Sequence, residues 1–324
     1  MKAKNMKYRK FGSIAGFEVS EIGFGGAAVS GEGGGYGFGF VEEKDALDLL
    51  HKAYDSGINL FDTAPIYGFG LSEKRFGKAF KGMREKVFIV SKSGVTWDSS
   101  KRVDMNNDPK IAQKMLDQSL KDLQTDYIDL FMIHWPDEKH DIRKPMEVLY
   151  KAKEEGKIRH IGLGNSFPED IEKACEIAQV EVLQNEFNLF ARYPQESLFE
   201  IIREKNLGFM SWGTLDKGIL TGTVTPNRKY DKADARSHAP WWKSADRKPK
   251  FNAMEKIMPI LKANNHTGLE MALGFVLQFE ELSTALCGTK SFAQLESAVN
   301  ALGNLPSKDL LEEISEIAKK ELEN

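Results

Sequence analysis

The chain has 324 residues, of which 41% are hydrophobic and 29% charged, and its formal net charge is −3. This balance provides no basic surface for nucleic acid or an anionic membrane, and no apolar run reaches the length of a membrane span, so neither partner is expected. A chain of this length can bury a core large enough to fold without a disulfide or a structural metal, and we expect no metal site.

The chain opens with a predicted β-hairpin, in which Tyr8–Phe11 and Phe17–Val19 flank a turn from Gly12 to Gly16. Short apolar runs then alternate with segments of helical periodicity. The predicted strands are Val19–Gly23, Asn59–Asp62, Val87–Ser91, Ile128–His134, Ile158–Gly162, Val182–Asn185, Gly208–Ser211 and Ser283–Leu286. The predicted helices are Asp45–Ser56, Ser72–Ala79, Ile111–Leu123, Lys144–Glu155, Pro168–Ala178, Leu198–Lys205, Leu269–Leu277 and Gln294–Leu302.

Eight strand-then-helix units without a break in composition predict one domain over residues 1–324, a closed (β/α)₈ TIM barrel of the α/β class with an N-terminal hairpin. Two segments fall outside the repeat, Gly31–Gly39 and Pro226–Lys250, and we expect both to be long loops on the carboxyl face of the barrel. The first lacks the glycine spacing of a dinucleotide-binding motif, so we interpret it as a rim loop. Ser307–Glu323 predicts a further helix on the outside.

Reactive side chains stand at the predicted carboxyl ends of three successive strands. These are Asp62, Lys92 and His134, and Tyr67 follows Asp62 by five residues. A nearby ammonium favours the ionised form of a phenol, and a carboxylate would hold that ammonium in place and keep it charged. The set therefore predicts a phenol tuned for proton transfer, with His134 donating a hydrogen bond to a carbonyl oxygen. Each residue alone has a structural explanation as a turn former, a solvated charge or a satisfied polar group.

Two cysteines, Cys175 and Cys287, are far apart and belong to no Cys/His cluster, which indicates free thiols in a reducing cytoplasm. The basic N-terminus is not followed by the apolar run of a signal peptide. We therefore expect a cytoplasmic protein.

The motifs around these residues resemble the aldo-keto reductase superfamily, and the resemblance runs from the hairpin at Tyr8–Gly12 to Gly288–Gln294. The matching stretches are Phe61–Gly68 (FDTAPIYG), Val90–Lys92 (VSK), Leu130–Pro136 (LFMIHWP), Gly156–Gly162 (GKIRHIG) and Gly218–Gly222 (GILTG). The resemblance implies an NAD(P)H-dependent reductase of aldehydes and ketones. It also implies that Tyr67 protonates the carbonyl oxygen, that Lys92 and Asp62 support Tyr67, and that His134 helps to bind the carbonyl.

The resemblance further implies a set of cofactor contacts. Asn165 and Gln184 would hold the nicotinamide carboxamide, and the ring of Trp212 would stack on the nicotinamide. Lys290 would meet the adenosine 2′-phosphate, which favours NADP(H), with NAD(H) as the alternative. The full set of implied cofactor-binding positions is Gly25, Gly26, Asp62, Asn165, Gln184, Trp212, Gly213, Leu215, Lys217, Gly288, Lys290 and Gln294. Leu215 and Lys217 would lie in the loop that wraps the pyrophosphate.

The chain departs from the family pattern at several cofactor positions. Gly164 replaces a serine that usually bonds the cofactor, and Ser297, Ala298 and Gln294 replace acidic, asparagine and arginine residues near the adenine. These changes bear on the choice between NADPH and NADH.

Aromatic residues are the candidates for the substrate pocket, because an aromatic lip suits apolar carbonyl compounds. Trp135, Trp97 and Phe69 are the main candidates, and Tyr36, Trp241 and Trp242 are further ones.

Two alternatives to a reductase remain at this point. One is a redox-sensing regulatory subunit of a potassium channel with the same barrel, and the other is a Schiff-base lyase or aldolase that uses Lys92 as an amine nucleophile.

Overall fold

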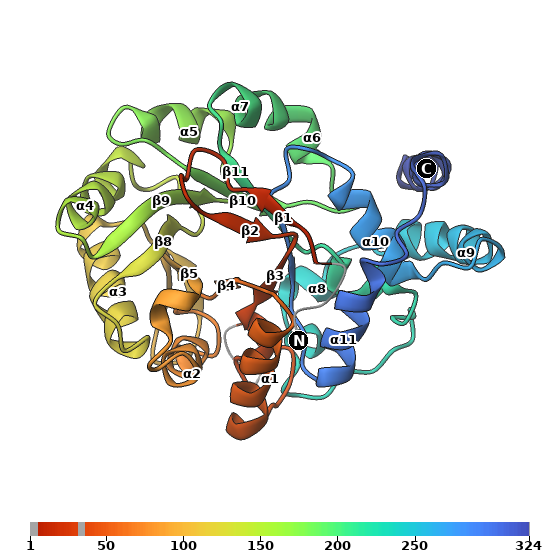
Figure 1. The fold of residues 1–324 in the computed structure, drawn as a ribbon, viewed down its shortest axis with the longest axis horizontal. Coiled ribbons are helices and arrows are strands. Elements are labelled where there is room, and N and C mark those ends of the chain that lie inside the picture. Colours follow the sequence, from red (N-terminus) through yellow and green to blue (C-terminus); the bar gives the residue numbers. More distant parts are fainter. Residues whose placement is uncertain (1–5, 32–35, 324) are drawn as a thin grey trace.

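The computed structural model describes residues 6–31 and 36–323, and its centre is a closed barrel of eight parallel strands (Figure 1). Pairing of Ala285 with Ile22 joins the last strand to the first and closes the barrel. The strands, in their order around the barrel, are β3 Ile22–Gly25, β4 Leu60–Asp62, β5 Phe88–Ser93, β8 Ile128–Ile133, β9 Ile158–Gly164, β10 Val182–Glu186, β11 Gly208–Trp212 and β12 Thr284–Cys287. The predicted (β/α)₈ fold is confirmed.

Helices surround the barrel and bury one apolar face each against it (Figure 1). They are α1 Glu43–Asp55, α2 Leu71–Ala79, α3 Pro109–Asp122, α4 Arg143–Glu154, α5 Pro168–Cys175, α6 Tyr193–Ser197, α7 Phe199–Glu204, α10 Gly268–Leu277 and α11 Phe292–Ala301. The predicted helix Leu198–Lys205 is thus the shorter α7, preceded by α6. Short 3₁₀ turns occur at η1 Gly26–Val29, η2 Arg84–Lys86, η3 Asp216–Thr221 and η4 Ala235–Ser237.

The N-terminal hairpin consists of β1 Tyr8–Lys10 and β2 Glu18–Ser20 and lies across one end of the barrel (Figure 1). The prediction of a first barrel strand at Val19–Gly23 is wrong at its start, because Val19 pairs with Arg9 in the hairpin and β3 begins at Ile22. The two strands follow one another with a single residue between them, so their apolar residues form one continuous run in the sequence.

Two segments of the chain contain elements that have no counterpart in the sequence-based assignment. The hairpin of β6 Val95–Trp97 and β7 Val103–Met105 follows β5 and is largely exposed, so it carries little apolar periodicity. The helix α9 Lys248–Ala263 overlaps the end of the predicted loop Pro226–Lys250, and the short α8 Pro240–Lys243 lies within that loop. Pro249 signals a loop in sequence, but at the first turn of α9 a proline costs no hydrogen bond.

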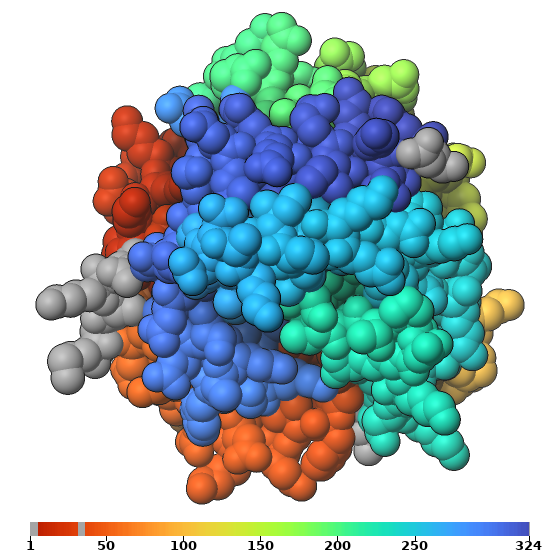
Figure 2. All heavy atoms as spheres, turned by 90° about the vertical axis from the view of Figure 1, so that its right-hand side faces the viewer, coloured from red at the N-terminus to blue at the C-terminus, as the bar shows by residue number. Residues whose placement is uncertain are grey.

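The C-terminal helix α12 Lys308–Leu322 confirms the helix expected on the outside of the barrel. It packs along α9, where Lys256 forms an ion pair with Glu321, and Figure 2 shows the two helices side by side on one face. Within the described residues, no helix combines the length and the apolar character that a membrane crossing requires.

Candidate active site

The buried ion pair of Lys92 and Asp62 lies at the carboxyl end of the barrel. Asp62 is the last residue of β4, and Lys92 is the penultimate residue of β5. The Lys92 ammonium donates to Asp62 Oδ1 at 2.6 Å and to the carbonyl oxygen of Thr63 at 2.8 Å, and its side chain is fully buried. Because the barrel brings the ends of β4 and β5 side by side, two residues 30 positions apart in sequence meet here.

Tyr67 and His134 complete the cluster that the sequence predicts. Tyr67 lies in the turn between β4 and α2, where its backbone N–H donates to the carbonyl oxygen of Ala64 at 3.0 Å. Its ring centroid lies 5.3 Å from the Lys92 ammonium and 5.9 Å from the centroid of the His134 ring, which follows β8. The structure therefore gathers all four predicted residues at one end of the barrel.

Burial dominates the electrostatics of this cluster. It raises the pKa of Tyr67 well above its usual value of 10, and the Asp62 carboxylate raises it further. This direction is the opposite of the one that the sequence predicts from a neighbouring ammonium, because burial and the Asp62 carboxylate both disfavour the ionised phenol. Burial also lowers the pKa of Lys92, against the opposing effect of Asp62, and lowers the pKa of His134 well below 6.5, so the imidazole is neutral at neutral pH.

Two side-chain amides connect this cluster to the next strands. Gln184 on β10 donates from Nε2 to Asp62 Oδ1 at 2.7 Å. Asn165, directly after β9, donates from Nδ2 to the carbonyl oxygen of His134 at 2.9 Å and accepts from Trp212 Nε1 at 2.8 Å. Its φ of 52° lies in the left-handed region, which asparagine tolerates better than most residues. The residues implied as contacts of the carboxamide and the nicotinamide ring thus adjoin the four-residue cluster.

Two glycines at the end of β3 allow the chain there to approach the ends of β4 and β12 closely. A Cβ at Gly26 would lie 2.6 Å from the carbonyl oxygen of Asp62, and one at Gly25 would lie 3.2 Å from the backbone nitrogen of Gly288. A larger residue at Gly26 would therefore displace the strand end that carries Asp62.

The loop after β11 has an unusual backbone. Asp216, Lys217 and Gly218 all have positive φ, and Lys217 forms an ion pair with Glu186 at the end of β10. A Cβ at Gly213 would lie 2.9 Å from the same Glu186 carboxylate. Leu215 precedes η3 and packs against the main core. Of the two residues implied to lie near the pyrophosphate, only Lys217 has a charged side chain that could attract it.

Lys290 lies beside a cavity of about 410 Å³ on the rim of the barrel. Its ammonium donates to the carbonyl oxygen of Phe38, and its backbone N–H donates to Gln294 Oε1 at 2.8 Å. The other residues that line the cavity are Phe38, Gly39, Phe40, Arg228, Lys229, Tyr230, Asp231, Asp234 and Arg236. Arg228, Lys229 and Arg236 are not among the residues predicted from the sequence, although the high density of basic residues in Pro226–Lys250 is a signal for them.

These residues fit a nicotinamide dinucleotide in chemical type. Amide groups beside the reactive cluster suit a carboxamide, and an indole ring next to them suits stacking on a flat ring. Cations beside the rim cavity suit phosphate groups.

Aromatic side chains surround the mouth of the site. Phe69 and Trp97 pack with their ring centroids 5.2 Å apart, and Trp135 lies 6.2 Å from Trp212. Phe69 and Trp135 also pack on the same small cluster as Tyr67. The site thus contains all three of the main candidates for the substrate pocket, with Trp97 at its exposed edge.

The remaining aromatic candidates separate into two groups. Tyr36 stacks on Trp241, with ring centroids 6.3 Å apart, and packs on the same cluster as Tyr67. Trp242 is buried in the main core, where it contacts Tyr230 and Arg247, and so it does not line the mouth.

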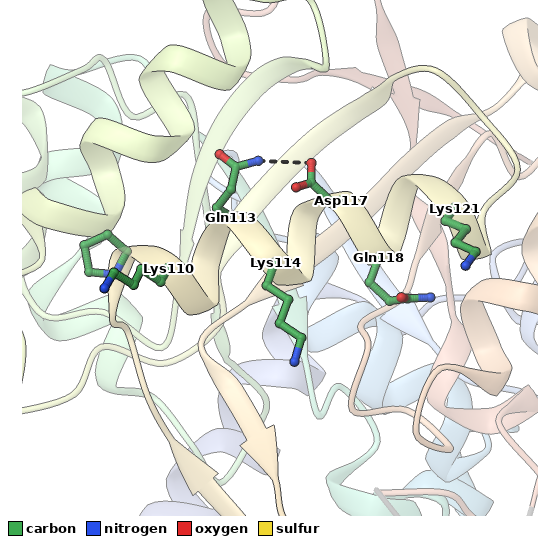
Figure 3. Close-up of a pocket in the computed structure, with 7 residues that line it drawn as sticks. Lys110, Gln113, Lys114, Asp117, Gln118 and Lys121 are labelled. Carbon is green, nitrogen blue, oxygen red and sulfur yellow. Dashed lines mark hydrogen bonds between the residues drawn. The ribbon is translucent and has the colours of Figure 1, made fainter.

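A second hollow follows the outer surface of α3 and has none of these properties (Figure 3). All of its lining side chains come from this one helix, and the only hydrogen bond among them joins Gln113 to Asp117. Its lining residues are Pro109, Lys110, Gln113, Lys114, Asp117, Gln118 and Lys121. It is a solvated helix face on the outside of the barrel.

Comparison with known proteins agrees with this geometry. The model of the aldo/keto reductase family matches residues 21–319. The chain is 33% identical over 306 residues to the aldo-keto reductase YhdN of Bacillus subtilis, covering 93% of this chain and 91% of the relative. It is 30% identical over 315 residues to the NADH-specific methylglyoxal reductase of Escherichia coli, covering 92% and 95%.

A solved structure supports the same relationship. The glycerol dehydrogenase AKR11B4 from Gluconobacter oxydans superposes with a TM-score of 0.83 at 27% identity, over 98% of this chain and 96% of that one. The chain therefore belongs to the aldo/keto reductase family and is a nicotinamide-dependent oxidoreductase of carbonyl compounds.

Proposed function

We propose that this enzyme reduces small aldehydes and ketones with Tyr67 as the proton donor, NADP(H) as the favoured cofactor and NAD(H) as the alternative. The observation that carries the proposal is the buried cluster in which Lys92, fixed by Asp62, lies 5.3 Å from the centroid of the Tyr67 ring. A bound nicotinamide cofactor supplies the hydride for such a reduction.

The raised pKa of Tyr67 defines its part in the reaction. The phenol keeps its proton through neutral pH and can therefore give it to a carbonyl oxygen as negative charge develops there. The phenolate that remains lies near the Lys92 ammonium, and opposite charges at short range in a buried site attract strongly. Asp62 holds that ammonium in place, so its own role is positional.

His134 orients the carbonyl group in this proposal. Its imidazole is neutral, because burial and the Lys92 charge lower its pKa, and a neutral imidazole can still donate one hydrogen bond. Asn165 fixes the backbone behind it by donating to the His134 carbonyl oxygen at 2.9 Å. The imidazole is thereby held beside the phenol.

The preference for NADP(H) rests on the cations of the rim cavity. Lys290 and the neighbouring Arg228, Lys229 and Arg236 outnumber the two carboxylates of Asp231 and Asp234. An excess of positive charge suits a ligand that carries an additional phosphate.

A cytoplasmic location is part of the same proposal. Cys175 and Cys287 are both free thiols, which suits a reducing compartment.

The experiment that tests the proposal is the substitution Tyr67→Phe. We expect the variant to lose carbonyl reduction by a factor of about 100 or more, because general acid catalysis contributes at least this much, while it binds NADPH nearly as well as the wild type. Steady-state NADPH oxidation with a panel of aldehydes and ketones measures the first effect, and cofactor fluorescence measures the second.

The matched control is Tyr150→Phe, which removes a phenol from the outer face of α4 and should leave turnover unchanged. Wild-type turnover by the Tyr67→Phe variant at neutral pH would refute the proton-donor assignment. Borohydride trapping of a substrate on Lys92 would instead identify a Schiff-base enzyme.

A further inference from the structure

Tyr36 lies at the substrate side of the site although it comes from the glycine-rich segment. Its ring packs on the small apolar cluster of Ala64, Ile66 and Val95, which also contacts Tyr67. Its φ of 64° is in the left-handed region, a conformation that costs free energy in a tyrosine and that the surrounding contacts must maintain. The chain therefore turns at Tyr36 in a way that places a phenol in the same cluster as Tyr67.

Tyr36 and the two residues after it contact the long loop that follows β11. The ring stacks on Trp241 at an interplanar angle of 20°. One residue further on, the carbonyl oxygen of Gly37 accepts from the backbone N–H of Ala235 at 2.9 Å, and Phe38 forms an antiparallel bridge with Asp234. Two loops that are about 200 residues apart in sequence thus hold the ring in place.

The Tyr36 hydroxyl has no hydrogen-bond partner among the residues that the structure describes. The side chain is half-buried. Phe69 and Trp135 pack on the same cluster, and neither side chain carries an oxygen that could accept a hydrogen bond from this hydroxyl. A half-buried phenol in such surroundings meets water or a polar group of a ligand, because leaving a hydroxyl unpaired is unfavourable.

Resting on the proposed function, we infer that Tyr36 is a specificity-determining residue whose hydroxyl binds a second oxygen of the substrate. The substrate class is then small carbonyl compounds that carry a further hydroxyl or carbonyl oxygen, while Tyr67 serves the reacting oxygen. The electrostatic effect of Tyr36 on Tyr67, which contributes to the raised pKa of Tyr67, is consistent with their proximity.

The test compares two aldehydes that differ by one hydroxyl group, 2-hydroxypropanal and propanal, in the wild type and in Tyr36→Phe. The phenylalanine ring preserves the packing on Trp241 and removes only the hydroxyl. We expect the ratio of the two kcat/KM values, 2-hydroxypropanal over propanal, to fall about three- to tenfold, the effect of one uncharged hydrogen bond. Trp241→Leu removes the stacking partner instead and should lower the same ratio by a smaller factor.

Tyr150→Phe serves again as the control and should leave the ratio unchanged. An unchanged ratio in Tyr36→Phe, whether both rates fall together or neither changes, would overturn the inference, because a structural role would affect both aldehydes alike. A wild-type protein that reduces neither aldehyde nor any other carbonyl compound would refute the proposed function itself, which is a distinct result.

Discussion

In the proposed function, Lys290 is the residue that bears most directly on the choice between the two nicotinamide cofactors. Its ammonium donates to the carbonyl oxygen of Phe38 beside the rim cavity, and burial lowers its pKa, so this charge is partly removed from water. A phosphate oxygen is a stronger acceptor for an ammonium than a neutral carbonyl oxygen. A ligand phosphate at this position would therefore replace Phe38 as the partner of Lys290.

Replacing Lys290 with alanine should weaken the binding of NADPH about ten- to hundredfold and scarcely affect NADH, because only NADPH carries the 2′-phosphate. Titration of both cofactors by fluorescence measures the two dissociation constants. The control variant is Lys144→Ala, which removes an exposed charge from the outside of α4. Equal weakening of NADPH and NADH would exclude the 2′-phosphate role.

At the scale of an element, helix α2 places a buried carboxyl group behind the catalytic strand. Glu73 accepts from the hydroxyl of Ser91 on β5 at 2.6 Å, and Ser91 immediately precedes Lys92. The pKa of Glu73 is raised to about 7, chiefly by burial; the nearby Asp122 of α3 also raises it, and Ser91, Ser119 and Lys92 lower it. Glu73 is therefore largely protonated in the folded protein at pH values where it is ionised in the unfolded chain.

The stability of the protein should consequently depend on pH through Glu73. A folded-state pKa of about 7 against 4.5 in the unfolded chain means that the contribution is fully present below pH 4.5 and is lost as the pH rises to about 7. The loss amounts to about 3 kcal/mol in the free energy of unfolding. Because glutamine cannot ionise, Glu73→Gln should gain stability relative to the wild type as the pH rises from 5 to 8.

Urea unfolding at several pH values measures this relative gain. Glu172→Gln, an exposed substitution on α5, is the control and should show no such trend. Parallel pH curves for Glu73→Gln and the wild type would show that Glu73 does not titrate in this range.

At the scale of the whole molecule, the N-terminal hairpin closes the end of the barrel opposite the active site. Phe11 follows β1, is fully buried and contacts Phe88 at the start of β5, with ring centroids 5.6 Å apart. It belongs to a cluster within the barrel that also contains Leu130 and Met210, separate from the larger core between barrel and helices. Gly12 permits this approach, because a Cβ there would lie 2.1 Å from the backbone nitrogen of Gly208.

Phe11→Ala should therefore lower the free energy of unfolding by about 3 to 5 kcal/mol, the usual cost of truncating a buried phenylalanine, and leave KM for the carbonyl substrate unchanged. Urea denaturation and steady-state kinetics measure the two quantities. Tyr150→Ala, which truncates a half-exposed ring on α4, should cost much less. A large rise in KM for Phe11→Ala would show that the hairpin and the active site are coupled.

Local patterns in the sequence were sufficient to predict the barrel and the position of its reactive residues. Strands buried on both faces form apolar runs whose carboxyl ends can be identified, and in a parallel barrel those ends meet, so Asp62, Lys92 and His134 could be placed together without coordinates. The patterns failed in two places. Around Val19 the apolar residues of β2 and β3 form one run, so the boundary between the two strands could not be located, and the exposed β6–β7 hairpin has too few buried apolar residues to be recognised.

The sequence by itself determined the fold class, the family and which polar side chains meet at the carboxyl end of the barrel, because these depend on residue types at spacings set by strands and helices. Only the tertiary structure decided the electrostatics and the rim. The pKa of Tyr67 rises chiefly because the phenol is buried, and burial is a property of the assembled site. In the same way Tyr36 and Trp241, on loops far apart in the chain, meet only because the barrel places both loops at the same end.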